Sequence, residues 1–176
     1  QVGHLERFNP ALRAAAEVVT RPRFLECHRL APFVDRGTDV DVIHDLMIHD
    51  LDVIQSFVRA EVVAVESVGV PILTSSVDIA NARLRFADGC IANVTASRVS
   101  LKRERKLRIF QPDAYVAIDY DQRTVRICSR VPARGLGGLP EIVVREHDVG
   151  EGDPLLDEVR AFLTAVATRT VPIVTG

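Results

Sequence analysis

The densest group of ionisable side chains runs from Asp41 to Asp52 and contains four aspartates and two histidines. Asp45, His49 and Asp52 are spaced i, i+4 and i+7, so on a helix they lie on one face. A histidine one turn from a carboxylate can donate or accept a proton in catalysis, because the carboxylate tunes the pKa of the imidazole. The spacing leaves three roles open: a general acid/base pair, a metal site or a solvated helix face.

A metal site is the least complete of these three alternatives. One histidine and two carboxylates do not make a full zinc shell. The other histidine, His44, lies about 140° around the helix from His49, so the two imidazoles do not converge on one ion. No metal ligand is therefore assigned, although another segment could supply one.

The segment Gly3–Pro10 reads Gly-His-Leu-Glu-Arg-Phe-Asn-Pro and is the second unusual string. Asn9 is a favourable N-cap and Pro10 a favourable first helical residue, which predicts a helix over residues 10–19. Free backbone N–H groups at a helix start, next to a charged segment, suit an anionic or sugar ligand. The alternative is a short strand, a turn and an ordinary capped helix, with Arg7 in water.

A third feature is a run of basic side chains with a single acidic residue, Glu104, among them: Arg98, Lys102, Arg103, Arg105, Lys106 and Arg108. Such a cluster can bind a diphosphate or RNA, or it can be the solvated end of a hairpin that protects a sheet edge. The whole chain has 22 basic and 24 acidic residues, a net charge of −2, 5% aromatic residues and no tryptophan. This composition argues against nucleic-acid binding and against attraction to an anionic membrane.

The segments that carry these residues change from a helical to a strand period along the chain. Apolar residues at helical spacing predict a helix over 40–58, capped by Asp39, and a last helix that starts at Asp153-Pro154. Period-two alternation predicts strands over residues 23–30, 62–70, 77–86, 90–100, 106–110, 115–120, 124–129 and 142–146. Turns or loops are expected at residues 88–89, 121–123 and 134–140. Helices followed by hairpin-connected strands indicate an α+β fold with a large, mostly antiparallel sheet.

Other features of the sequence indicate where the protein works and how much of it is present. Cys27, Cys90 and Cys128 each lie in an apolar, strand-like run, which is typical of buried thiols in a reducing cytoplasm. There is no leader and no run of about 18 apolar residues, so we expect a cytoplasmic protein that does not enter a membrane. The chain starts at Gln1 and reads like the middle of something longer. We therefore expect residues 1–176 to be a single domain of a longer protein.

The string Gly3–Pro10, together with the Asp-x-x-x-His motif of Asp45 and His49, resembles the Gfo/Idh/MocA family of sugar oxidoreductases. The resemblance covers essentially all 176 residues and corresponds to the C-terminal domain of that family, without the N-terminal Rossmann domain. It implies a glyceraldehyde-3-phosphate-dehydrogenase-like C-terminal domain, an open sheet with helices on one face. The Gly3–Pro10 string is most similar to the subgroup that oxidises C3 of UDP-N-acetylglucosamine-type sugars.

The resemblance also implies roles for single residues. His49 would accept or relay the proton of the reacting hydroxyl, and Asp45 would orient or polarise that group. Four further side chains would approach the nucleotide-sugar substrate: Glu6, Arg7, Asn9 and Arg98. NAD or NADP would bind to the upstream domain, which also carries the lysine of a Glu-Lys-Pro motif, so no cofactor is expected on residues 1–176 alone.

The family resemblance further implies a homo-oligomer formed through the open face of the sheet. Two other functions remain as alternatives at this point. One is a non-catalytic module in which the sheet mediates oligomerisation or interaction and the His/Asp row is only solvated. The other is a metal-dependent sugar isomerase or hydrolase.

Overall fold

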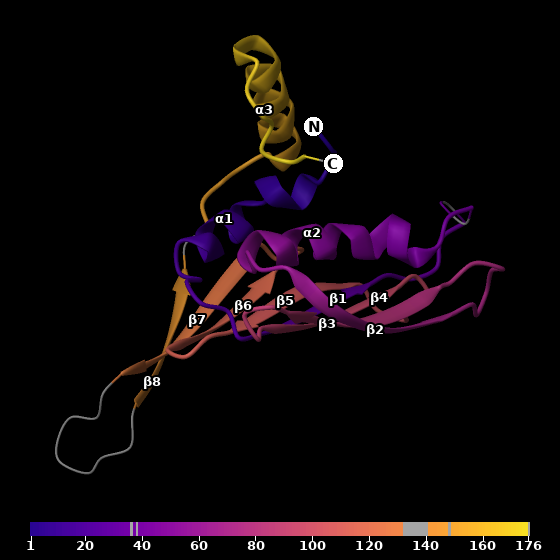
Figure 1. The fold of residues 1–176 in the computed structure, drawn as a ribbon, viewed down its shortest axis with the longest axis horizontal. Coiled ribbons are helices and arrows are strands. Elements are labelled where there is room, and N and C mark those ends of the chain that lie inside the picture. Colours follow the sequence, from indigo (N-terminus) through magenta and orange to yellow (C-terminus); the bar gives the residue numbers. More distant parts are fainter. Residues whose placement is uncertain (36, 38, 132–140, 148, 176) are drawn as a thin grey trace.

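The computed structural model describes residues 1–35, 37, 39–131, 141–147 and 149–175. These residues form an eight-stranded sheet with α1 and α2 on one of its faces (Figure 1). The strands are β1 (Phe24–Leu30), β2 (Val62–Val70), β3 (Ile79–Phe86), β4 (Ile91–Ser97), β5 (Glu104–Phe110), β6 (Ala114–Asp119), β7 (Thr124–Val131) and β8 (Glu141–His147). The helices are α1 (Pro10–Ala16), α2 (Ile48–Phe57) and α3 (Pro154–Thr168), with a 3-10 turn η1 (Leu5–Phe8) before α1 and a π-helical turn η2 (Ile43–Met47) before α2.

The sheet is open and almost entirely antiparallel. Its strand order is β2-β3-β4-β1-β5-β6-β7-β8, and β1 pairs with β4 in parallel. The other six pairings are antiparallel within the described residues. β1 is central because the chain leaves it through η2 and α2 and returns at the edge strand β2. The predicted α+β fold with a large, mostly antiparallel sheet is confirmed.

The core lies between the sheet and the two helices that cover it. Alternate side chains of β1, among them Leu25 and Cys27, are fully buried and face the helices. Val53 and Ile54 of α2 are equally buried on the other side of this layer. Each such side chain contributes about 1.5–3 kcal/mol through burial, so this layer fixes how α2 sits on the sheet. Cys27 and Cys90 are free and buried, as expected for small apolar fillers.

Local signals in the sequence correctly locate the starts of α1 and α3 and the turn between β3 and β4. The Asn9 side chain accepts a hydrogen bond from the N–H of Ala11 at 3.0 Å, and Asp153 accepts one from the N–H of Leu155 at 3.1 Å. Both helices start with proline, as predicted. Gly89 adopts a φ of +83° in the hairpin between β3 and β4, which is the conformation that favours glycine. The loop predicted at 134–140 lies outside the described residues.

Several predicted elements differ from the structure. The helix predicted over residues 10–19 ends at Ala16, and the strand predicted over residues 90–100 covers Ile91–Ser97. The segment before Asn9 is the 3-10 turn η1 and not a short strand. The helix predicted over residues 40–58 begins at Ile43, and its cap is Asp41 rather than Asp39, because Asp41 accepts the N–H groups of Ile43 and His44. Its first turn is π-helical, which the spacing of apolar residues does not reveal.

Helix α3 stands apart from the sheet and contacts η1 (Figure 1). Its apolar side chains, which the sequence places on one stripe, are exposed, and none of its residues is buried. The two ends of the described chain lie side by side, where the N–H of Val2 donates to the carbonyl of Val174 at 3.2 Å. None of the helices in the described part of the chain has the length and apolar character that crossing a lipid bilayer requires.

Candidate functional site

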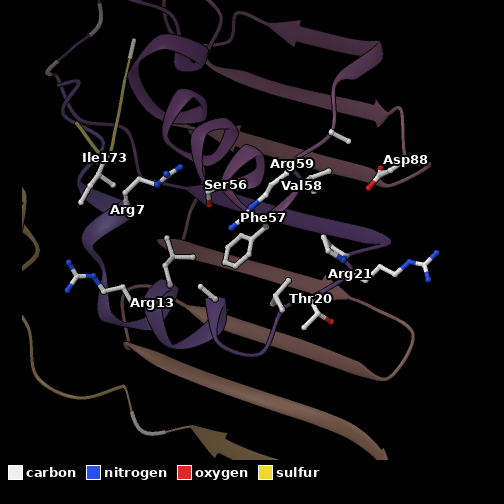
Figure 2. A pocket seen from close by; sticks show the side chains of 15 residues that line it. Arg7, Arg13, Thr20, Arg21, Ser56, Phe57, Val58, Arg59, Asp88 and Ile173 are labelled. Carbon is white, nitrogen blue, oxygen red and sulfur yellow. The ribbon is translucent and has the colours of Figure 1, made fainter. Parts of the chain in front are cut away.

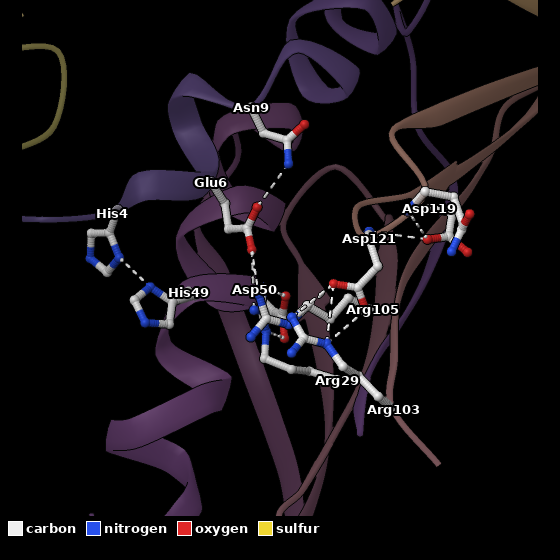
Figure 3. A network of polar contacts seen from close by, with 11 residues as sticks. His4, Glu6, Asn9, Arg29, His49, Asp50, Arg103, Arg105, Asp119 and Asp121 are labelled. Carbon is white, nitrogen blue, oxygen red and sulfur yellow. Dashed lines mark hydrogen bonds and ion pairs between the residues drawn. The ribbon is translucent and has the colours of Figure 1, made fainter. Parts of the chain in front are cut away.

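The segment before α1 runs alongside the helix that carries the Asp/His motif, and two side-chain contacts join them. His4 Nδ1 lies 3.4 Å from His49 Nδ1, with the two rings at 84° to one another. Three residues further along both segments, Arg7 Nη1 lies 3.5 Å from Asp52 Oδ1. Figure 3 shows the His4 and His49 imidazoles facing each other between η1 and α2. The two strings noted in the sequence therefore form one site.

Local hydrogen bonds hold the η1 segment in this position. The N–H of Asn9 donates to the carbonyl of Glu6 at 3.0 Å, and the Asn9 side-chain amide donates to Glu6 Oε2 at 3.2 Å. Asn9 also caps α1, and its side chain is buried. Glu6 and Asn9 thus shape the backbone turn that presents His4 and Arg7 to α2.

Beneath this turn lies a buried ion pair between β1 and α2. Arg29 donates two hydrogen bonds to the two oxygens of Asp50, both at 2.8 Å, and a third to Glu6 Oε1 at 3.2 Å (Figure 3). The Arg29 and Asp50 side chains are only 4% and 1% exposed. A bidentate arginine–carboxylate pair is rigid as well as strong, so it fixes the rotation of α2 relative to the sheet. That rotation determines where His49, the residue before Asp50 in α2, points.

Charges around the pair influence both Arg29 and His49. Burial disfavours the charged form of Arg29, but the hydrogen bonds and charge of Asp50, with the charge of Glu6, together raise the pKa of its guanidinium. The pKa of His49 is lowered, first because the ring is partly buried and then because of the positive charges of Arg29 and His4. Asp50 and Glu6 oppose this shift without cancelling it. His49 is therefore held as the neutral imidazole at neutral pH, ready to accept a proton.

Asp45 lies in the π-helical turn η2, four residues before His49 on α2. The Asp45 carboxylate lies against Gly37, close to where a side chain at that position would begin. Among the described residues, no hydrogen bond or ion pair connects it to His49.

Arg98, expected near the substrate, lies within the protein. Its guanidinium is 5% exposed, forms an ion pair with Asp78 at 2.8 Å, and also donates to the carbonyls of Gly37 and Val40 and to the hydroxyl of Thr74. Burial raises the pKa of Asp78, but backbone N–H donors and Arg98 outweigh this and hold it well below its usual range. Arg98 therefore joins the loop before α2 to the sheet, and we do not carry it into the proposed site.

The rest of the basic run forms ion pairs on the protein surface. Its members pair as Lys102 with Glu104, Arg103 with Asp121, Arg105 with Glu6 and Asp121, Lys106 with Glu104 and Asp119, and Arg108 with Glu26. The cluster resembles the solvated alternative more than a diphosphate site, because carboxylates already neutralise it.

Three residues of the site were not singled out in the sequence, although two carried a usable signal. Asp50 lies between Met47 and Ile54 on the buried stripe of its helix, and Arg29 follows Leu25 and Cys27 on the inward side of β1. A charge on an inward position predicts a buried partner of opposite charge. His4 had no such signal, because its contact with His49 depends on how η1 packs on α2.

The described residues do not form a metal centre or a dinucleotide site. Within the described ranges, no three histidine, cysteine, aspartate or glutamate side chains come together as a metal-binding group. The sequence contains no Gly-x-Gly-x-x-Gly turn between a strand and a helix, which is the turn that holds the pyrophosphate of a nicotinamide dinucleotide. The candidate site is formed by the neutral imidazole of His49 and the charged, ordered turn of Gly3–Pro10.

Comparison with known proteins identifies the family of this chain. A family model described as the GFO/IDH/MocA C-terminal domain matches residues 15–116. The chain belongs to the GFO/IDH/MocA family. It is also 40% identical to the UDP-N-acetylglucosamine 3-dehydrogenase of Acidithiobacillus ferrooxidans. The alignment extends over 169 residues and covers 96% of this chain and 54% of that protein. This GFO/IDH/MocA domain thus spans about half the length of the curated relative that it matches.

Solved structures show the same fold. The structure of the Acidithiobacillus ferrooxidans UDP-N-acetylglucosamine 3-dehydrogenase GnnA matches with a TM-score of 0.86 and 39% identity, over 97% of this chain and 54% of that one. Levoglucosan dehydrogenase, in complex with NADH and levoglucosan, matches with a TM-score of 0.75 and 16% identity, over 97% and 57% of the two chains. The second match shows the shared GFO/IDH/MocA fold alone.

Proposed function

We propose that this chain is the substrate-binding domain of a longer, NAD(P)-dependent oxidoreductase that oxidises the C3 hydroxyl of a UDP-N-acetyl amino sugar. The single observation that carries the proposal is the half-buried His49, held neutral beside the Gly3–Pro10 turn. The 40% identity to a UDP-N-acetylglucosamine 3-dehydrogenase, along 96% of this chain, supports the substrate class.

His49 acts as the general base in this proposal. Oxidation of an alcohol removes a hydride from the carbon and a proton from its hydroxyl, and the proton goes to His49. When the Nδ1–H of His49 donates to Nδ1 of His4, the lone pair on Nε2 is free to accept that proton. His4 would then select the tautomer of His49, while Arg29 and Asp50 fix the rotation of the helix beneath it.

The remaining site residues would position the sugar. Arg7 would approach the substrate from η1. Asn9 and Glu6 would act mainly by fixing this turn, since the buried Asn9 side chain caps α1 and the Glu6 carboxylate accepts hydrogen bonds from Asn9 and Arg29. Asp45 is assigned to the reacting hydroxyl by its match to the family motif. It would orient the substrate and not His49, with which it makes no contact among the described residues.

The nicotinamide cofactor would be held outside this chain. The sequence contains no Gly-x-Gly-x-x-Gly turn that could bind its pyrophosphate. We therefore place NAD or NADP on an upstream Rossmann domain, which would also carry the lysine of a Glu-Lys-Pro motif. When bound there, NAD or NADP would supply the hydride acceptor for the carbon whose hydroxyl gives its proton to His49. Residues 1–176 form a single domain in this proposal.

The uncovered surfaces support a larger assembly. On the open face of the sheet, cross-strand neighbours form one continuous row over six strands, which we call the aromatic row: Ile91, Phe24, Phe110, Tyr115, Cys128 and Val144. We place the contact between two copies of the chain on this face, and the exposed side of α3 against other parts of the full-length protein.

A cytoplasmic location fits the free thiols.

The test uses the full-length protein with UDP-N-acetylglucosamine and NAD⁺, read as the absorbance of NADH. We expect turnover that falls by about 100-fold or more in His49→Gln and also falls in Asp45→Asn. A full-length protein that oxidises no nucleotide sugar would overturn the proposal. If that protein still formed oligomers, the result would favour a non-catalytic interaction module.

A further inference from the structure

A groove of about 780 Å³ opens between α1 and the end of α2, and arginines surround it (Figure 2). Four of its lining residues are arginines, and one, Asp88, is acidic. Its wall is otherwise partly apolar, with Phe57 near the middle. A volume of this size lies within the usual range of small-molecule sites, and the excess of positive charge selects an anion.

Two of the four arginines point into the groove. In Figure 2 the side chains of Arg7 and Arg59 extend toward each other over Ser56. Arg13 is turned away from the middle of the groove and pairs with Asp157 at 3.1 Å. Arg59 has no ion-pair partner among the described residues, and the contact of Arg7 with Asp52 is long, at 3.5 Å. Guanidinium groups of this kind have donors to spare for a ligand.

The groove continues from the site that contains His49. His49, Asp52 and Ser56 lie on one face of α2, at i, i+3 and i+7. Ser56 is therefore about 10 Å from His49 along the helix axis. A nucleotide sugar carries its diphosphate on C1, two carbons from C3, and the nucleoside beyond it, so a sugar whose C3 lies at His49 extends its charged part along this face.

We propose that Arg7 and Arg59 bind the diphosphate of the nucleotide-sugar substrate in this groove, with the nucleoside against Phe57. This inference rests on the proposed function, because it takes its ligand class from the sugar placed at His49. Arginine suits the role, because its planar guanidinium matches phosphate oxygens in a bidentate manner.

The experiment measures the binding of uridine 5′-diphosphate to the full-length protein by calorimetry, alongside the KM and kcat for UDP-N-acetylglucosamine. In Arg59→Gln we expect the affinity for uridine 5′-diphosphate to fall and the KM to rise by about 10- to 100-fold, the usual loss for a hydrogen bond to a charged group. The kcat should stay within about twofold, because Arg59 does not touch the reacting carbon. Thermal melting shows whether the exposed substitution leaves the fold intact.

Arg13→Gln is the matched control, since Arg13 lines the same groove but is turned away from its middle. It should bind uridine 5′-diphosphate as the wild type does. Unchanged binding in Arg59→Gln, or an equal loss in both variants, would overturn the proposal. If the protein oxidised no nucleotide sugar but Arg59→Gln alone lost uridine 5′-diphosphate binding, the groove assignment would stand and the proposed reaction would fail.

Discussion

His4 Nδ1 lies 3.4 Å from His49 Nδ1, so the two strings that stand out in the sequence meet through a pair of imidazoles. The contact lies beside the buried pair of Arg29 and Asp50, whose charges act on His49 (Figure 3). The Gly3–Pro10 segment therefore does more than start α1. It supplies the group that orients His49, and the charge that His4 carries when protonated lowers the pKa of His49.

Replacing His49 by glutamine should lower kcat/KM for UDP-N-acetylglucosamine by about 100-fold or more in the full-length protein. Glutamine keeps hydrogen-bonding groups at this position but cannot accept the proton of the hydroxyl. The control is His44→Gln, because His44 is exposed, lies in the preceding turn and pairs with Asp41. Similar activity of the two variants would contradict the general-base role and support the alternative, in which Asp45, His49 and Asp52 are only a solvated helix face.

Replacing His4 by glutamine should change the pH dependence of the reaction. The positive charge of His4 is one cause of the lowered pKa of His49, together with burial and Arg29, while Asp50 and Glu6 act in the opposite direction. Removing His4 therefore raises the pKa of His49. Because a general base works only when deprotonated, the acidic limb of the kcat/KM profile should move to higher pH.

This prediction separates a positioning role of His4 from a structural one. A variant that only loosens the site would lower kcat/KM at every pH and leave the limb where it is. His28→Gln serves as the control, since His28 lies on the opposite face of β1 and pairs with Glu104. Its profile should coincide with that of the wild type.

The sequence predicts well those features that depend on neighbours along the chain. Asn9-Pro10 and Asp153-Pro154 start helices, Gly89 turns a hairpin, and the alternating runs become strands, because caps, turns and period-two burial are local effects. The family motif also singles out His49, which lies 3.4 Å from His4 of the other string. The sheet order with β1 at its centre is a long-range property, which local patterns do not encode.

The features that the sequence did not predict depend on contacts between distant elements. The Asp45 carboxylate lies against Gly37 and forms no hydrogen bond or ion pair with His49 among the described residues. Arg98 becomes buried against Asp78 because the loop before α2 folds over the sheet. Spacing along one element gives no information on either packing event.

The pair of Arg29 and Asp50 should dominate the stability of the site. Arg29→Met leaves Asp50 buried without its charge partner, so we expect the free energy of unfolding of the full-length protein to fall by about 3–5 kcal/mol. Urea denaturation measures this loss. The double variant Arg29→Met with Asp50→Leu should regain much of it, because neither buried charge remains.

Arg108→Gln is the control for this stability prediction. Arg108 pairs with Glu26 at 3.0 Å on the open face of the sheet, and both side chains are partly solvated. Such a pair contributes about 0–1 kcal/mol. A loss in Arg29→Met no larger than that of Arg108→Gln would show that the buried pair does not hold α2 in place.

The aromatic row on the open face should mediate self-association. Phe110 lies at its middle, with ring centroids 5.6 Å from Phe24 and 4.8 Å from Tyr115, and remains 37% exposed. Phe110→Arg places a charge in this apolar surface and should reduce the mass of the full-length protein, measured by light scattering, toward that of the monomer. Leu101→Arg, on a fully exposed loop residue, should leave the mass unchanged. If the oligomer persists in Phe110→Arg, the contact between copies does not depend on the aromatic row. The exposed apolar residues of α3 would then be the next ones to substitute.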